Sequence, residues 1–179
     1  MTHHDALVSL LLGVEAEVDQ DGWDARPSLL ILKTRAGMIN AEVAPLPEEI
    51  ADAADYVEHL ATAVGISPTF RARFVAGLGP NILGLGLVTE AWAVSDPQAV
   101  KDVQRSRRVR PISHHPRRQE LRIVSAAVPE RDLCVQRIRG GVPTLFYDSA
   151  DSAIGRRIEG RVPESLRTLL NVVRSISLN

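Results

Sequence analysis

The chain has 179 residues, 45% of them hydrophobic and 24% charged, with a formal net charge of −1. Its single cysteine, Cys134, excludes an intramolecular disulfide framework and a cysteine-rich zinc motif. The sequence has no apolar run of about 20 residues and no basic segment before its first apolar stretch. We therefore expect a soluble cytoplasmic domain with a sizeable core and no membrane contact.

The first 44 residues predict a helix followed by a strand pair. Leucines and valines at helical spacing indicate a helix over residues 4–18, and Gly22 ends the pattern. Residues 28–34 form an apolar run of strand length. Residues 38–44 can return beside this run after a turn at Gly37, which predicts a β-hairpin.

Two helices are predicted next. Pro47 suits the first position of a helix, and the two glutamates that follow it are favoured by the helix dipole. An unbroken apolar face then extends over residues 50–64, and Gly65 is expected to end the helix. A shorter helix is predicted to start at Ser67 and to reach about residue 76.

Residues 83–95 are the longest uncharged apolar run apart from Glu90, and they predict the central strand of a single sheet. The glycines in residues 77–86 (GLGPNILGLG) follow a helix and precede a strand. A dinucleotide-binding loop needs the reverse context, so these glycines indicate close packing and no cofactor. Glu90 could be a buried general base, and it could equally lie on an exposed edge or pair with an arginine from a later hairpin. Structural pairing is the favoured interpretation.

The region after the central strand predicts a helix, a connection and a hairpin. Residues 98–108 can be helical, whereas two prolines interrupt residues 110–118. Residues 120–128 alternate, with Leu121 and Ile123 on one face. After a turn at residues 130–132, residues 133–139 return as the antiparallel partner.

The end of the chain predicts a short edge strand at residues 143–147, a polar loop at residues 148–162 and a helix that opens at Pro163. The layout predicts a single α+β domain over residues 1–179. Its mostly antiparallel sheet should have about four to five strands, with helices packed mainly on one face.

The sequence contains no catalytic, metal or cofactor motif. His114 and His115 are neighbours, so on an extended strand they would point in opposite directions and could not share one metal ion. Cys134 lies in a predicted strand, where a buried, inert thiol is usual. A hydrolase that combines Glu90 with His114 or His115 is a weaker alternative.

The charge is divided between the two ends of the chain. Residues 1–60 hold twelve acids and three bases, a net −9, and residues 101–179 hold sixteen bases and eight acids, a net +8. Such a division can reflect an anion-binding face, a charged interface or attraction between the two ends within one fold.

The basic segment, residues 101–118, has seven bases and one acid, and we expect it to be a connection that can be mobile. Arginine suits phosphate recognition, although no aromatic residue is interleaved for base stacking. The candidate nucleic-acid-binding residues are Arg105, Arg107, Arg108, Arg110, Arg117 and Arg118.

Three segments share a recognisable texture: residues 86–94 with the VTEAW strand, residues 115–140 with HP-x-R-x-E-x-R and R-x-R-G, and residues 160–170 (GRVPESLRTLL). In these segments the chain resembles small uncharacterised proteins of actinobacteria and their phages. The resemblance implies no activity and no functional residue.

We therefore expect a non-enzymatic cytosolic or phage-encoded protein that acts through protein–protein contacts, with a protein partner or as a homo-oligomer. The alternative is a nucleic-acid-binding accessory protein that uses the basic segment. No cofactor is expected.

Overall fold

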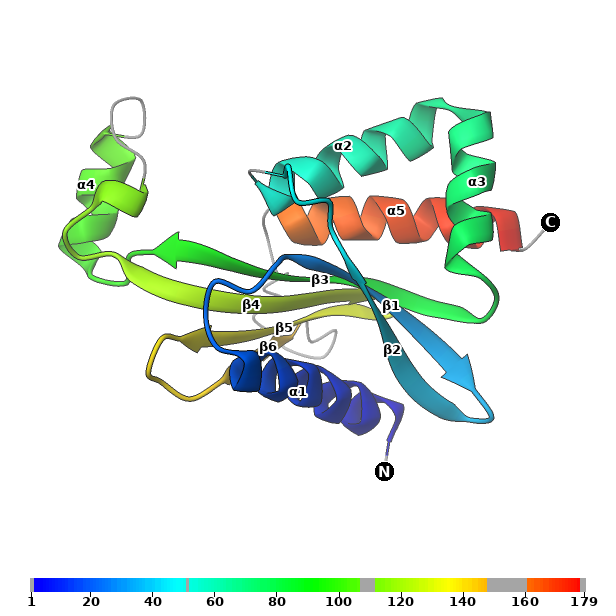
Figure 1. Ribbon diagram of the computed structural model, residues 1–179, viewed down its shortest axis with the longest axis horizontal. Helices are drawn as coiled ribbons and strands as arrows, with labels where there is room; N and C mark the ends of the chain where they lie inside the picture. The colour runs from blue at the N-terminus through cyan, green and yellow to red at the C-terminus, as the bar shows by residue number, and fades with distance from the viewer. Residues whose placement is uncertain (1, 51, 107–111, 148–160, 178–179) are drawn as a thin grey trace.

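The computed structural model describes residues 2–50, 52–106, 112–147 and 161–177. Six strands form one sheet in the order β2-β1-β3-β4-β5-β6, and all neighbouring strands are antiparallel (Figure 1). The strands are β1 (Ser28–Arg35), β2 (Met38–Pro45), β3 (Ile82–Ala93), β4 (Gln119–Val128), β5 (Arg131–Ile138) and β6 (Thr144–Tyr147). The helices are α1 (His3–Asp21), α2 (Ala53–Ile66), α3 (Pro68–Leu78), α4 (Pro97–Ser106) and α5 (Arg161–Ser177), with a short 3-10 helix, η1 (Ile112–His114), before β4.

The predicted α+β class is confirmed, and β3 lies inside the sheet as expected. The sheet has six strands, more than the four to five predicted, because both candidate edge strands, β2 and β6, pair with it. The hairpin of β4 and β5 also forms. Its turn is shorter than predicted, since Arg131 and Asp132 already belong to β5.

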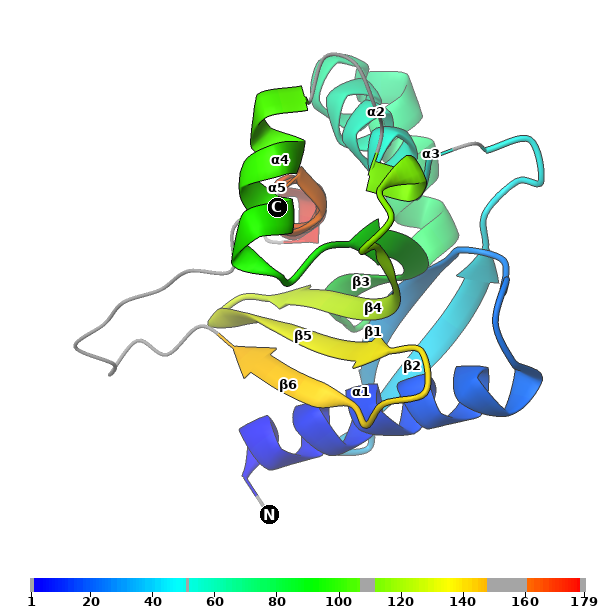
Figure 2. The same ribbon diagram turned by 90° about the vertical axis from the view of Figure 1, so that its left-hand side faces the viewer.

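Helices cover both faces of the sheet. Helices α2, α3 and α5 lie on one face and α1 lies on the other (Figure 2). The reason is visible in β1, where Leu29 and Ile31 are buried against α2 and α5, whereas Leu30 and Leu32 are buried against α1. A strand that is apolar on both faces needs cover on both, so the sheet separates two hydrophobic cores.

The start of α2 and its junction with α3 differ from the prediction. Helix α2 begins at Ala53, not at Pro47, because the Asp52 carboxylate accepts hydrogen bonds from the N–H groups of Ala54 and Asp55 as its N-cap. Gly65 does not end the helix, which continues to Ile66. Ser67 is the cap that α2 and α3 share, and its extended backbone is the conformation preferred before a proline.

The glycines of β3 allow close packing, as predicted. A Cβ atom added to Gly84 would lie 2.5 Å from the backbone oxygen of Ala127, and one added to Gly86 would lie 2.5 Å from that of Ser125. Both oxygens belong to the neighbouring strand β4, so a larger residue would push the two strands apart.

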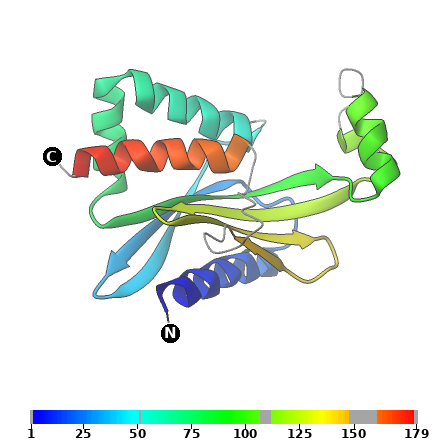
Figure 3. The ribbon, with the colours of Figure 1, turned by 180° about the vertical axis from the view of Figure 1, so that it is seen from behind.

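The last helix begins at Arg161, two residues before the predicted Pro163. Residues 148–160 of the predicted loop lie outside the described residues. The helix predicted over residues 98–108 corresponds to α4, and its last two residues, 107 and 108, also lie outside the described residues. Helix α4 extends beyond the sheet, at the ends of β3 and β4 (Figure 3).

Candidate functional site

The helical layer of α2 and α5 does not reach the end of the sheet where α4 stands (Figures 1 and 3). At this place a cavity of about 630 Å³ lies over the strands. The first residues of α2, the first residues of α5 and Ile112 of η1 form its walls. The volume is within the range of roughly 300–1,000 Å³ that is usual for binding pockets.

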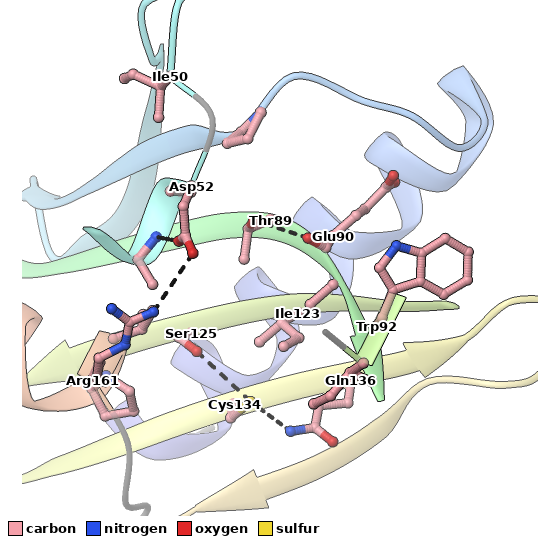
Figure 4. A pocket seen from close by; sticks show the side chains of 17 residues that line it. Ile50, Asp52, Thr89, Glu90, Trp92, Ile123, Ser125, Cys134, Gln136 and Arg161 are labelled. Atoms are coloured by element: carbon pink, nitrogen blue, oxygen red, sulfur yellow. Dashed lines mark hydrogen bonds and ion pairs between the residues drawn. The ribbon is translucent and has the colours of Figure 1, made fainter. Parts of the chain in front are cut away.

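The floor of the cavity comes from three neighbouring strands (Figure 4). Thr89, Ile123 and Gln136 lie side by side on β3, β4 and β5, and Ser125 and Cys134 form the next row on β4 and β5. Paired residues in a sheet point to the same face, so these five side chains project toward the helices that flank the cavity.

The polar groups of the floor bind one another. The Ser125 hydroxyl donates to Cys134 Sγ at 3.8 Å, and Gln136 Nε2 donates to the same sulfur at 3.5 Å. The Thr89 hydroxyl donates to the backbone oxygen of Glu90 at 3.4 Å. Burial raises the pKa of the Cys134 thiol, so the thiol stays protonated near neutral pH and is a poor nucleophile. This confirms the predicted buried thiol.

The carboxylates among the described lining residues are Asp52 and Glu90. Asp52 caps α2 and pairs with Arg161 at 3.6 Å. Glu90 alternates with Thr89 and therefore points to the opposite face of the sheet. The floor of the cavity thus offers apolar contact and neutral hydrogen bonding, whereas the charged residues Asp52 and Arg161 pair with each other at its wall.

A second hollow, of about 430 Å³, continues the cavity toward β6 and shares Gln136 with it. Five large apolar residues on β4, β5, β6 and the loop between β5 and β6 line these two hollows, and we call them the open face: Leu121, Ile123, Ile138, Val142 and Phe146. None of these five described residues belongs to either hydrophobic core. Ile138, Val142 and Phe146 are 43%, 80% and 45% exposed.

The predicted nucleic-acid-binding residues are only partly described. Arg117 forms an ion pair with Asp96 at 2.7 Å. The guanidinium of Arg118 lies 4.8 Å from the centre of the Trp92 ring, at the rim of the cavity. Arg105 belongs to α4, but its side chain lies outside the described residues. The remaining candidates, Arg107, Arg108 and Arg110, also lie outside them.

Glu90 pairs with an arginine of the hairpin, as favoured from the sequence. Its Oε1 atom lies 3.0 Å from Nη2 of Arg122, its partner in register on β4. Its Oε2 atom accepts a hydrogen bond from the Asp24 N–H at 2.7 Å. The hydrolase alternative gains no support, because both carboxylate oxygens of Glu90 are bonded to Arg122 and to the Asp24 N–H, and not to a histidine.

Arg122 is fully buried between the sheet and α1. It bonds Asp19 at 3.0 Å, contacts the backbone oxygen of Gly22, and lies 4.5 Å from the ring centre of Trp23. Beside it, Arg137 of β5 binds both carboxylate oxygens of the fully buried Glu15 at 2.7 Å. Glu90, Arg122 and Arg137 thus lie side by side on three strands, and Asp19 and Glu15 of α1 neutralise the two adjacent arginines.

The acids and bases that the sequence separates meet in these contacts. Acids of α1 bind Arg122 and Arg137, and Arg161 of α5 pairs with Asp55 and Glu58 of α2. The hydrogen bond with Asp55 raises the pKa of Arg161. Of the three explanations for the charge division, attraction within one fold therefore accounts for a large part of the described ion pairs.

Three carboxylates, Asp24, Glu90 and Glu120, come within 4.8 Å of one another. Glu90 and Glu120 are already neutralised by Arg122 and Arg139. This cluster is therefore part of the ion-pair network, and it carries no argument for a metal.

The sequence contained part of the signal for this site. Alternation placed Leu121 and Ile123 on one face, and both line it. Thr89, Ser125 and Gln136 carried no signal, because they come from three strands and form no motif.

No protein-family model, curated protein or solved structure matches this chain. The resemblance to actinobacterial and phage proteins stays a prediction. The fold and the site define the class as an α+β protein with one antiparallel sheet, and among the described residues no helix covers the part of its α2–α5 face where the cavity lies. Within the described residues, no helix has the length and apolar character needed to cross a membrane.

Proposed function

We propose that this protein is a non-catalytic binding protein that acts in the cytoplasm and holds a segment of a protein partner on its open face. One observation carries the proposal. On the same sheet face, Leu85, Leu87 and Ala127 are buried in the core that α2 and α5 cover, whereas the apolar side chains of the open face lie outside both cores. Contiguous exposed apolar side chains of this kind are typical of interaction sites.

The energy available from the open face is sufficient for a specific contact. Full burial of an exposed Ile, Val or Phe side chain stabilises a complex by about 1.5–3 kcal/mol. Ile138, Phe146 and Val142 are 43%, 45% and 80% exposed, so each can contribute a part of that energy. Part of this gain is offset by the lost freedom of the two partners. We therefore expect a contact in which these three side chains dominate the affinity.

The proposal can be tested with a random peptide library displayed on phage and selected on the purified protein. We expect enriched peptides that lose at least tenfold in affinity when Ile138→Asp places a charge in the open face. Ile66→Asp is the matched control, since Ile66 is 77% exposed at the far end of α2. Peptides that bind Ile138→Asp as well as the unmodified protein would contradict the proposal.

Nucleic-acid binding through the basic segment stays an alternative prediction. Its described residues give it limited support, because Asp96 already neutralises Arg117. The test is fluorescence anisotropy with single-stranded DNA and RNA at low salt. A salt-sensitive affinity that falls in the double variant Arg117→Ala and Arg118→Ala would favour this alternative.

A further inference from the structure

We infer that two copies of this protein pair through the outer edge of β2, with the two strands antiparallel and Ala41 of one copy opposite Ala41 of the other. This edge lies apart from the open face, because β2 and β6 form opposite sides of the sheet (Figure 2). Three features of β2 support the pairing: its free edge, the backbone groups that point outward from it, and the register in which it matches a copy of itself.

The first feature is the free edge. All eight residues of β2 pair with β1 without a bulge, and none of them is buried. No other free edge among the described strands is as long, since β6 has four residues and β3 lacks its β1 neighbour only from Thr89 to Ala93. Proteins usually protect a regular edge with charges, prolines or bulges. In β2 this protection is limited to Glu42, which Lys33 neutralises, and to Pro45 at the last position.

The second feature is the set of backbone groups that point outward, which are those of Ile39, Ala41 and Val43. The Leu46 N–H donates to the Pro27 backbone oxygen at 2.9 Å and continues the ladder of β1 and β2, so the even-numbered residues of β2 exchange their hydrogen bonds with β1. Alternate residues of an antiparallel strand bond to opposite sides, and the odd-numbered residues therefore face outward. In the described part of the chain, no hydrogen bond reaches the N–H or C=O groups of these three residues.

The third feature is the register. A two-fold axis at Ala41 places Ile39 opposite Val43 of the second copy, so all three outward-facing residues lie in hydrogen-bonded pairs. Each such pair exchanges two hydrogen bonds, which makes about six across the edge. A shift by two residues in either direction would place Ile39 opposite Pro45, which lacks an N–H, or Val43 opposite Gly37 in the turn. One symmetric register thus uses the edge best.

The side chains are compatible with the same register. On the α1 face of the sheet, Ile39 would meet Val43 of the second copy, which is 54% exposed in the single chain. Cross-strand pairs of apolar β-branched residues stabilise a sheet, whereas like charges directly opposite each other destabilise it. On the other face Asn40 would lie opposite Glu42, so no two like charges meet. Backbone and side chains therefore favour a second copy as the occupant of this edge.

Light scattering after size-exclusion chromatography, over a range of protein concentrations, measures the pairing. We expect a dimer whose dissociation constant rises at least tenfold in Ala41→Pro, because proline removes an outward N–H from each copy and leaves the ladder with β1 in place. Val43→Lys is a second variant, which puts a charge into the apolar pair. Ile66→Asp, an exposed change on α2, is the matched control and should leave the dimer unchanged. Circular dichroism and urea midpoints establish that each variant is folded.

Disulfide cross-linking tests the register. Ala41→Cys should link two copies when an oxidant is added, because the Cα atoms of a hydrogen-bonded pair are about 5.5 Å apart, within the roughly 4.4–6.8 Å that a disulfide spans. Val43→Cys should not link them, since the two substituted positions would be about 13 Å apart along the strands. The native Cys134 is buried and does not compete.

Three outcomes would overturn the inference. The first is a protein that stays monomeric at every concentration. The second is a dimer that folded Ala41→Pro and Val43→Lys leave unchanged, and if Ile138→Asp dissociates it, the second copy occupies the open face. The third is a cross-link that forms through Val43→Cys in preference to Ala41→Cys. Peptides that bind the open face of a monomeric protein would leave the proposed function standing without this dimer.

Discussion

Replacement of Arg122 by methionine should be among the most destabilising single changes in this protein. The arginine is fully buried, and its guanidinium serves Asp19 and Glu90 as well as the backbone oxygen of Gly22. Methionine keeps an unbranched chain in place of the inner part of the arginine and lacks the outer atoms of the guanidinium, which carry its charge. The substitution therefore tests the electrostatic role of Arg122 more than its packing.

The magnitude follows from the groups left behind. Without Arg122, the Glu90 carboxylate, which is 13% exposed, keeps the hydrogen bond from the Asp24 N–H, and the fully buried Glu15 loses one of its two arginines and keeps Arg137. Loss of one partner of a buried ion pair costs about 3–5 kcal/mol, because a charge stays buried without compensation. A loss of this size is comparable to much of the stability of a typical domain.

Urea denaturation followed by circular dichroism measures the effect, provided that the slope of the unfolding free energy against urea is unchanged. Arg117→Met is the matched control. Its pair with Asp96 is exposed at both side chains, and such pairs contribute roughly 0–1 kcal/mol. Arg122→Lys should be intermediate, because it restores the charge but not the forked geometry.

A further substitution separates charge burial from general damage. Glu90→Leu in the Arg122→Met background removes the carboxylate that lost its partner, and it should recover part of the stability. The reasoning would be refuted if Arg122→Met cost no more than Arg117→Met. It would also be refuted if the second substitution lowered stability further.

Three other predictions follow from local contacts. Gly86→Ala should destabilise the protein by about 1–3 kcal/mol, because the added methyl group overpacks against β4. Gly13→Ala lies in open space on α1 and should stabilise the protein by about 0.5–1 kcal/mol. Equal urea midpoints for the two variants would contradict this prediction. Cys134 should react with a thiol reagent far more slowly in the native protein than in urea, and rapid native labelling would refute its burial. The hydrogen bond from the Ala99 N–H, and then Arg117, lower the pKa of Asp96 below 3.8. The stabilising contribution of the Asp96 carboxylate should therefore be present above pH 3.8 and be lost as the pH falls through the lowered pKa. A pKa of Asp96 at or above 3.8 in an NMR titration would contradict this prediction.

Much of the fold was predictable because its signals are local. Helical spacing of apolar residues predicts α1 and α5, and period-two alternation predicts β4. Local chemistry also misled in places. Pro47 and Gly65 are residues that often begin and end helices, but the Asp52 cap and the turn at Ser67 decided the boundaries of α2.

The candidate site was predictable only in part. The alternation of Leu121 and Ile123 indicated an apolar face, but no pattern within β4 could say that the helical layer covers Ala127 on that face and not Leu121 or Ile123. That depends on where α2 and α5 begin relative to strands far away in the chain. The basic segment was conspicuous in the sequence, yet Arg117 is occupied by Asp96, 21 residues away.

The sequence by itself determined the elements, the close approach at the β3 glycines and the burial of Cys134, since each depends on neighbours along the chain or on residue size. The tertiary structure alone decided which charges meet. Arg122 lies 103 residues from Asp19 and Arg137 lies 122 residues from Glu15, and these pairs form because the sheet register and α1 bring them together. The division of charge along the chain suggested an outside partner, but many of these charges pair with each other within the fold. The open face is therefore the better candidate for a partner-binding surface.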